Sequence, residues 1–171
     1  FYDTNLALAS PNPPFDFYEP NRPIYSHPRF LPGTIIQDSH LEDVLLSEGC
    51  CIKNAELRNC VVGVRSQIRS GVKIYNTILM GADYYDEKSC GESPADGRVP
   101  IGIGEGSVID GAIIDKNARI GRGVTIRPFP RDCEDVDGEN WFVRDGVVVI
   151  PKNATLLPGT AIGPELAEKM D

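Results

Sequence analysis

Aliphatic side chains recur every six residues in three separate stretches of this chain. A small or aliphatic residue, such as Ala118, Val124 or Ala154, stands in the fifth place of most of these hexads. The aliphatic positions are Val62, Ile68 and Ile74, then Ile114, Ile120 and Ile126, and finally Ile150, Leu156 and Ile162. A period of six fits neither the 3.6-residue turn of a helix nor the two-residue alternation of long strands. It predicts an all-β solenoid, a parallel β-helix in which three hexads form one coil around a central column.

Between Ile36 and Met80 the spacing of aliphatic residues is five or six rather than a strict six. A tighter corner can absorb a five-residue step, so we interpret this stretch as part of the same coil. The alternative is an antiparallel sandwich of short strands. Asn-Gly and Asp-Gly hairpin signals are missing here, which favours the β-helix.

Two polar stretches, 81–100 and 127–146, interrupt the pattern. We expect both to be excursions from the coil, and surface loops of this length often carry function. The second contains the only tryptophan, Trp141, and we expect it to be looped out over about one coil's length. Its Asp135-x-Asp137-Gly138 run resembles half a calcium loop but lacks the bidentate acid, so no calcium site is expected.

The ends of the chain differ from the coil. Residues 1–10 place apolar side chains on one helical face, and we expect them to be the end of a helix. Residues 11–35 form a connector with seven prolines, which excludes regular helix or a central strand. Its aromatic residues indicate packing on another surface. The β-helix domain is predicted over 36–171, and residues 164–171 are expected to form a short C-terminal helix that caps the last coil.

The formal net charge of −8 and a pI of about 4.8 exclude a sequence-independent grip on nucleic acid or an anionic membrane. Any anion site must therefore be local. No signal peptide and no apolar run near the length of a membrane span is evident.

Five cysteines are present, an odd number without CxxC spacing. We expect reduced thiols in a cytosolic or plastid-like compartment rather than a disulfide or metal framework. Only two histidines, His27 and His40, are available to a zinc site, so none is expected. The cysteines are Cys50, Cys51, Cys60, Cys90 and Cys133.

Lys116 and Lys152 occupy the same hexad place, in Ile-Asp-Lys-Asn-Ala and Ile-Pro-Lys-Asn-Ala. If 127–146 is looped out, they lie on adjacent coils at one edge, about 4.8 Å apart along the axis. Two ammonium groups so placed repel by about 1 kcal/mol in water. A bound anion would relieve that repulsion. The alternative is that both lysines are solvated and splay apart.

Arg29, in His27-Pro28-Arg29, is a guanidinium on a stiff proline segment, which suits a bidentate phosphate contact. An arginine that merely pins the connector to the coil is an equally good interpretation. His27 would be at most a secondary ligand.

Several segments resemble the C-terminal part of glucose-1-phosphate adenylyltransferase (ADP-glucose pyrophosphorylase) of the plant and cyanobacterial type. They cover nearly the whole chain in order, and LMGADYYD and IIDKNARIG are the most specific. The resemblance implies a left-handed β-helix that follows a nucleotidyltransferase domain in a homo- or hetero-tetramer. The other segments are FYDTNLAL, IYSHPRFLP, CVVGVRSQI, VPIGIGEGSVI and GVVVIPKNATLLPGT.

The resemblance also implies a function. The intact enzyme would make ADP-glucose and pyrophosphate from ATP and glucose 1-phosphate with Mg²⁺, for glycogen or starch, in bacterial cytoplasm or plastid stroma. Its catalytic groups belong to the N-terminal domain, so this part should be inert alone and hold no cofactor. Lys116 and Lys152 match positions that bind an activator such as 3-phosphoglycerate. Arg29 matches the arginine of a segment near the phosphate or sulfate site, whereas His27 stands where other members often carry a different polar residue. Residues 127–146 differ from the family's usual insert.

Two other functions use the same coil. A hexapeptide-repeat acyltransferase needs a catalytic histidine at a trimer interface, and His40 is the only candidate within the coils. A ligand-free assembly module would pair subunits through exposed strand edges.

Overall fold

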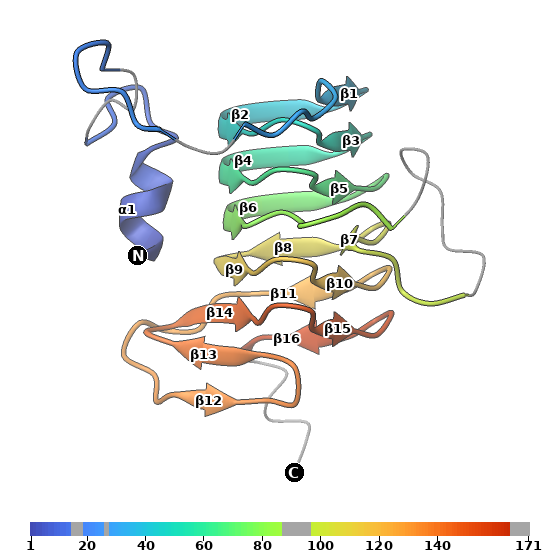
Figure 1. Ribbon diagram of the computed structural model, residues 1–171. Coiled ribbons are helices and arrows are strands. Elements are labelled where there is room, and N and C mark those ends of the chain that lie inside the picture. The colour runs from blue at the N-terminus through green and yellow to red at the C-terminus, as the bar shows by residue number, and fades with distance from the viewer. Residues whose placement is uncertain (15–18, 26–27, 87–96, 165–171) are drawn as a thin grey trace.

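The structure, a computed structural model, describes residues 1–14, 19–25, 28–86 and 97–164. It is a stack of coils built from short parallel strands, with one helix beside it (Figure 1). The elements are α1 (Tyr2–Ala7), β1 (Ile35–Gln37), β2 (His40–Leu46), β3 (Cys51–Lys53), β4 (Glu56–Val62), β5 (Gln67–Ile68), β6 (Lys73–Leu79), β7 (Gly102–Ile103), β8 (Val108–Asp110), β9 (Ala112–Ile114), β10 (Arg119–Ile120), β11 (Thr125–Ile126), β12 (Val136–Asp137), β13 (Phe142–Arg144), β14 (Val147–Ile150), β15 (Thr155–Leu156) and β16 (Ala161–Ile162).

The coil has three faces. The first is a parallel sheet in the order β1-β3-β5-β7-β10-β15. A second sheet covers the other two faces, because β2, β4 and β6 each run along both. In the next coil, β8 pairs with the first half of β6 and β9 with its second half. The second face thus continues through β8, β11 and β16, and the third through β9 and β14.

Like side chains stack inside this coil. Ile52 pairs in register with Ile68, Ile68 with Ile103, Ile103 with Ile120, and Ile120 with Leu156. All nine aliphatic positions predicted to line the column are buried, and Ile120 and Ile126 are fully buried. Burying one such side chain contributes about 1.5–3 kcal/mol, so the column is the main source of stability.

Two of the five-residue steps turn between the first and second faces, at Asp38 and Asn54, with φ of 48° and 43°. The others turn at the corner between the second and third faces. Asp43, Asn59 and Asn76 turn it with a single residue each, at φ of 53°, 51° and 45°. Asparagine and aspartate tolerate this left-handed region better than most residues, since their short polar side chains bond locally. The coil pairings of this stretch are parallel, so the antiparallel sandwich is excluded.

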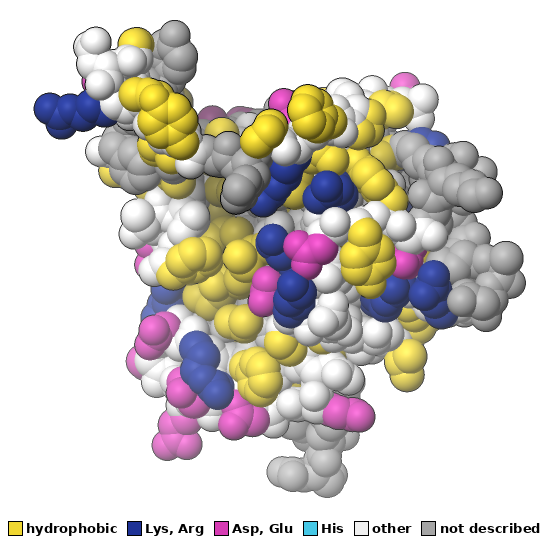
Figure 2. Space-filling view, in the orientation of Figure 1, with side chains coloured by type: hydrophobic (Ala, Val, Ile, Leu, Met, Phe, Trp, Pro, Cys, Tyr) yellow, Lys and Arg dark blue, Asp and Glu magenta, His cyan; other side chains and the backbone are white. Residues whose placement is uncertain are grey.

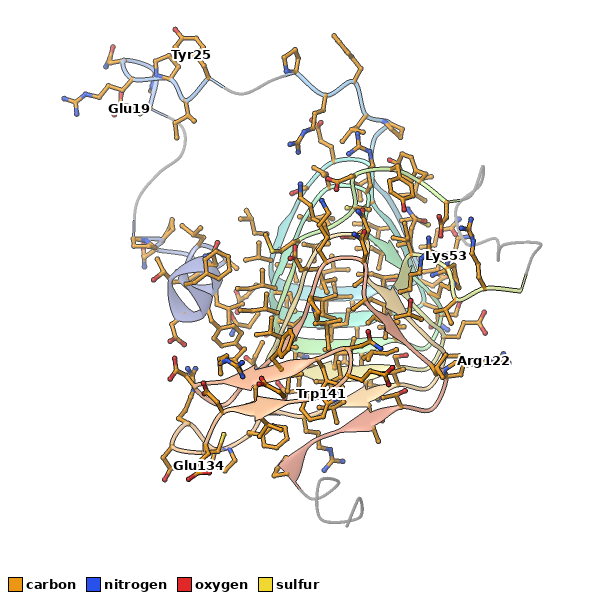
Figure 3. The ribbon with its side chains drawn as sticks, turned by 60° about the horizontal axis from the view of Figure 1, so that its bottom comes forward. Glu19, Tyr25, Lys53, Arg122, Glu134 and Trp141 are labelled. Atoms are coloured by element: carbon orange, nitrogen blue, oxygen red, sulfur yellow. The ribbon has the colours of Figure 1, made fainter. Side chains whose placement is uncertain are left out.

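Residues 127–146 are looped out of the coil as predicted, because β14 pairs directly with β9 of the preceding coil, but they are not an irregular loop. They form an antiparallel meander, β12-β13-β14, that extends the third face. Asp145 and Gly146, at φ of 50° and 74°, form the two-residue turn between β13 and β14, a conformation typical of type I′ hairpins. Trp141 stacks on Phe129, with ring centroids 6.5 Å apart, against the end of the coil (Figure 3).

The N-terminal helix packs beside β4 and β6. The Tyr2 hydroxyl donates a hydrogen bond to the carbonyl oxygen of Asn76. Arg131, in the second excursion, pairs with Asp3 at 2.8 Å and lies over the Tyr2 ring. Burial, with the nearby charge of Asp110, raises the pKa of Tyr2 to about 12. Helix, coil corner and second excursion are therefore held together at one place.

The connector is exposed at every described residue before Leu31 and contacts this chain's own coil only from Leu31 onward, as in the hydrogen bond from Thr34 to the Ser47 carbonyl. The side chains of Tyr25 and Phe30 are 91% and 98% exposed, and Figure 3 shows Tyr25 well clear of the strands. Packing on another surface stays a prediction. The expected C-terminal helix lies outside the described residues beyond Pro164, and no described helix is long and apolar enough to cross a membrane.

The expectation of five reduced cysteines is wrong for Cys51, which is disulfide-bonded. Cys50, Cys60 and Cys133 are free. Cys50 and Cys60 belong to the buried core cluster, and burial raises their thiol pKa. Cys51 alternates with inward-facing Ile52 and so lies on the outer side of β3, where it can reach another segment.

We expect Ile120→Ala to lower the free energy of unfolding by about 2–5 kcal/mol, because it leaves a cavity in the fully buried column. Urea denaturation measures this change. Leu157→Ala is the matched control: its side chain is 67% exposed, and its loss should change stability by no more than about 0.5 kcal/mol. Equal midpoints for both variants would contradict the inward phase assigned to Ile120.

The docking of α1 predicts a late tyrosine titration. Because docking raises the pKa of Tyr2 to about 12, its contribution to the free energy of unfolding is complete below the ordinary tyrosine pKa of about 10 and is lost as the pH rises through about 12. Ultraviolet absorbance should therefore show one late ionisation step that Tyr2→Phe removes. Tyr25→Phe, at an exposed position, should leave that step in place. A late step unaffected by Tyr2→Phe would show that the helix is not docked there.

Candidate anion-binding site

One corner of the coil, between the third and first faces, carries both predicted lysines. We call it the lysine corner; its residues are 47–50, 63–66, 80–82, 115–118 and 151–154. Ile114 pairs in register with Ile150, and the amide of Asn153 donates to the carbonyl oxygen of Lys116 at 3.0 Å. Lys116 and Lys152 are therefore stacked on adjacent coils at one edge, as the hexad phase predicted.

A carboxylate bridges the two lysines. Lys116 Nζ lies 3.0 Å from Asp83 Oδ1, and Lys152 Nζ lies 2.7 Å from Asp83 Oδ2. The side chains are 32%, 49% and 39% exposed for Lys116, Lys152 and Asp83, so the cluster faces solvent. Hydrogen bonds from Lys152 and Lys116 hold the pKa of Asp83 well below its usual range, and Asp83 in turn raises the pKa of Lys152. In Figure 2, basic and acidic side chains meet in the middle of the face shown.

Two asparagines hold Asp83 in this position. Asn117 Oδ1 accepts the backbone amide of Asp83 at 2.8 Å, and Asn117 Nδ2 donates to Asp83 Oδ2 at 3.2 Å. The same amide group donates to Asn153 Oδ1 at 3.1 Å. Asn117 and Asn153 turn the corner at φ of 61° and 62°, and the Asn117 side chain is buried. The two coils that carry the lysines therefore turn this corner with the asparagine that follows each lysine.

The first excursion starts from the same corner and is fastened there by a second carboxylate. Asp86 binds Arg119 with both oxygens, one pair at 3.0 Å, and accepts the amide of Ile101 at 3.0 Å. Arg119 also donates to the carbonyl of Val99 at 2.8 Å. Burial pushes the pKa of Asp86 up, but its bonds to Arg119 and Ile101 outweigh burial and leave the pKa below its usual value. The two ends of the excursion are thus joined across Arg119.

Tyr85 extends the corner toward the first coil. Its hydroxyl donates to the carbonyl of Gly49 at 2.8 Å, and the Arg65 guanidinium lies 5.9 Å from its ring centroid. A side chain at Gly49 would overlap the Tyr85 hydroxyl and contact Leu31 of the connector. This contact places the connector at the upper end of the lysine corner.

The structure does not bring Arg29 onto the lysines. Its carbonyl accepts the amide of Leu31 at 2.8 Å, next to Gly49, and three coil steps separate Gly49 from Asn117, about 14 Å along the axis. Within the described part of the chain, the Arg29 guanidinium makes no ion pair. His27 lies outside the described residues.

The two other kinds of site considered from the sequence, a catalytic histidine and a calcium loop, lack the surroundings that they would need. His40 lies in the first coil with a 64% exposed side chain, 3.9 Å from Glu42, without the enclosed surroundings of a catalytic base. Asp135 and Asp137 both pair with Arg144 rather than forming a cation site. The described residues hold no group of three or more His, Cys, Asp or Glu side chains arranged for a metal.

Comparison with known families agrees with this architecture. Residues 29–161 match the model of the GLGC left-handed parallel beta-helix domain. The match covers most of the chain and includes Arg29, Asp83 and both lysines. It also bears out the left hand expected for the coil.

The Asp86 contact makes a local prediction. Asp86→Ala removes the acceptor of the Ile101 amide and the partner of Arg119, so amide exchange at Ile101 should accelerate at least about tenfold. Hydrogen exchange by NMR measures this. The amide of Gly104, which donates to Ile120 at 2.8 Å within the coil, is the internal control and should keep its rate. Unchanged exchange at Ile101 would contradict the fastening role of Asp86.

Proposed function

Because this chain belongs to the GLGC left-handed parallel beta-helix domain family, the C-terminal domain of glucose-1-phosphate adenylyltransferases, we propose that it regulates and assembles an enzyme of that class. The reaction is the formation of ADP-glucose and pyrophosphate from ATP and glucose 1-phosphate. ATP and Mg²⁺ are bound by an N-terminal nucleotidyltransferase domain. The present residues do no chemistry on the substrates, and their task is to bind an effector and other subunits.

The plant and cyanobacterial type is part of this proposal. It rests on the segments around Asp83 and Lys116, LMGADYYD and IIDKNARIG. The corresponding location is the plastid stroma or the bacterial cytoplasm, and the effector is a phosphorylated metabolite like 3-phosphoglycerate, with inorganic phosphate as a related ligand.

One observation carries the effector site: two ammonium groups from adjacent coils converge on a single pair of carboxylate oxygens. A phosphoryl group offers three strong acceptor oxygens and about two negative charges, so it satisfies the same two donors. Lys116 and Lys152 are the primary ligands. Arg29 is a further ligand from the connector, for which the connector must move toward the lysine corner, and His27 stays a secondary candidate beside it.

An effector at this corner can act at a distance only if it binds two arrangements of the enzyme with different affinity. The lysine corner lies where the connector and the first excursion approach the coil through Tyr85, Gly49 and Leu31. Both segments are candidates for contact with the N-terminal domain. An anion held here would favour the arrangement in which they are drawn against the corner.

The first coil supports the assembly role. Ile36 continues the buried column formed by Ile52 and Ile68, yet 47% of it is exposed because no coil lies above it. Exposed Ile35 and Leu45 widen this apolar end. Apolar surface of this kind is typical of subunit interfaces. Oligomerisation through this end, within a tetramer, is compatible with effector binding at the lysine corner.

In the intact enzyme we expect Lys152→Ala to raise the activator concentration for half-maximal activation at least tenfold, about 1.4 kcal/mol, with little change in the unactivated rate. Steady-state assays with a titrated phosphorylated activator measure this. Lys73→Ala removes the same charge on the second face, away from the corner, and should leave activation unchanged. Identical activation of the Lys152→Ala variant and the unmodified enzyme would exclude Lys152 from the site.

A further inference from the structure

We propose that Asp83 is a built-in counter-anion that occupies the phosphate position of the lysine corner and must be displaced by an effector. The inference rests on the proposed effector site and assigns it a specificity-determining residue. Both oxygens of Asp83 are used, one on each lysine, at 3.0 Å and 2.7 Å. These are the donors that a phosphoryl group would take.

The contacts of Asp83 allow this exchange. Its backbone amide donates to Asn117, while its carboxylate, which also accepts a longer bond of 3.2 Å from Asn117 Nδ2, is attached through one methylene group and is 39% exposed. Rotation about that side chain can release the carboxylate into solvent without moving the backbone. Asp86, by contrast, is 5% exposed and fixed by Arg119 and the Ile101 amide. The first excursion thus stays attached to the coil when the Asp83 carboxylate leaves the two lysines.

The charges predict which ligands can displace Asp83. Lys116, Lys152 and Asp83 together carry a net charge of +1, and the nearby carboxylate of Asp115 offsets part of it. A tethered group acts at an effective concentration of millimolar or more. A monoanion that replaces the Asp83 carboxylate carries the same charge and therefore gains little electrostatic free energy. A dianion attracts both ammonium groups more strongly, so the corner should select phosphoryl and sulfate dianions over carboxylates and chloride.

The test is calorimetric titration of the chain with sulfate and with acetate at low ionic strength. Asp83→Asn keeps the size of the side chain and removes the competing charge. Sulfate should bind this variant at least tenfold more tightly, and acetate should gain by a similar factor, because both ligands lose the same competitor. Glu105→Gln is the matched control: it removes one negative charge beside Arg122, at a different edge of the coil, and should leave sulfate affinity unchanged (Figure 3). Circular dichroism verifies that each variant is folded.

Two results would overturn the inference. Weaker sulfate binding by Asp83→Asn would mean that Asp83 positions the lysines for a ligand. Unchanged binding would mean that it does not compete at all. If Lys152→Ala weakens sulfate binding while Asp83→Asn has no effect, the effector site stands and only the counter-anion role fails. If neither variant changes sulfate affinity, the proposed site fails as well.

The intact enzyme supplies a second measurement. Asp83→Asn should lower the activator concentration for half-maximal activation at least threefold, while Glu105→Gln should leave it unchanged. A higher or unaltered requirement in the Asp83→Asn enzyme would contradict the competition, whatever the behaviour of the chain in calorimetry.

Discussion

The structure depends on one constraint, the parallel register that places residues of the same hexad phase directly above one another. Inside the coil this register stacks Ile68, Ile103 and Ile120 and excludes water from a continuous column. At the lysine corner the same register superimposes Lys116 on Lys152, two side chains that repel. The repetition that stabilises the core therefore concentrates positive charge at its surface, and a carboxylate from outside the repeat offsets that charge.

Much of the fold and of the lysine corner could be predicted from the sequence, because the place of a residue in its hexad decides which way its side chain points. Identical hexad places give identical orientations, so the buried column and the stacked lysines follow directly. Asp83 could not be found in this way, since it lies just outside the repeat and reaches the lysines only through the path of the excursion. A signal did exist in the sequence. Asn117 and Asn153 follow the two lysines, and asparagine side chains stacked at a corner need a further polar group to complete their hydrogen bonds. The position of Arg29 along the coil axis could not be predicted either, because a residue on a proline-rich connector has no place in a hexad.

Two other differences between the predicted and the observed structure had causes that the sequence contains. The turn Asp145-Gly146 is a strong two-residue hairpin signal, and it marked the second excursion as strands rather than a loop. The outward phase of Cys51, opposite to that of Ile52, distinguished it from the core thiols, so a count of cysteines without their phase was misleading. In each case a local rule applied to particular residues was more informative than composition.

The antiparallel meander at the end of the coil farthest from β1 makes the two ends of the solenoid different. A parallel coil with two open ends can add further copies head to tail without limit, and such non-closing contacts produce fibres. Here β12 and β13 reverse the strand direction on the third face, and the outermost strand is two residues long, contains Asp137 and is preceded by Asp135. Short, charged edge strands resist further pairing. Further strand pairing is therefore disfavoured at this edge of the third face, which makes the two ends of the coil unequal as surfaces for association.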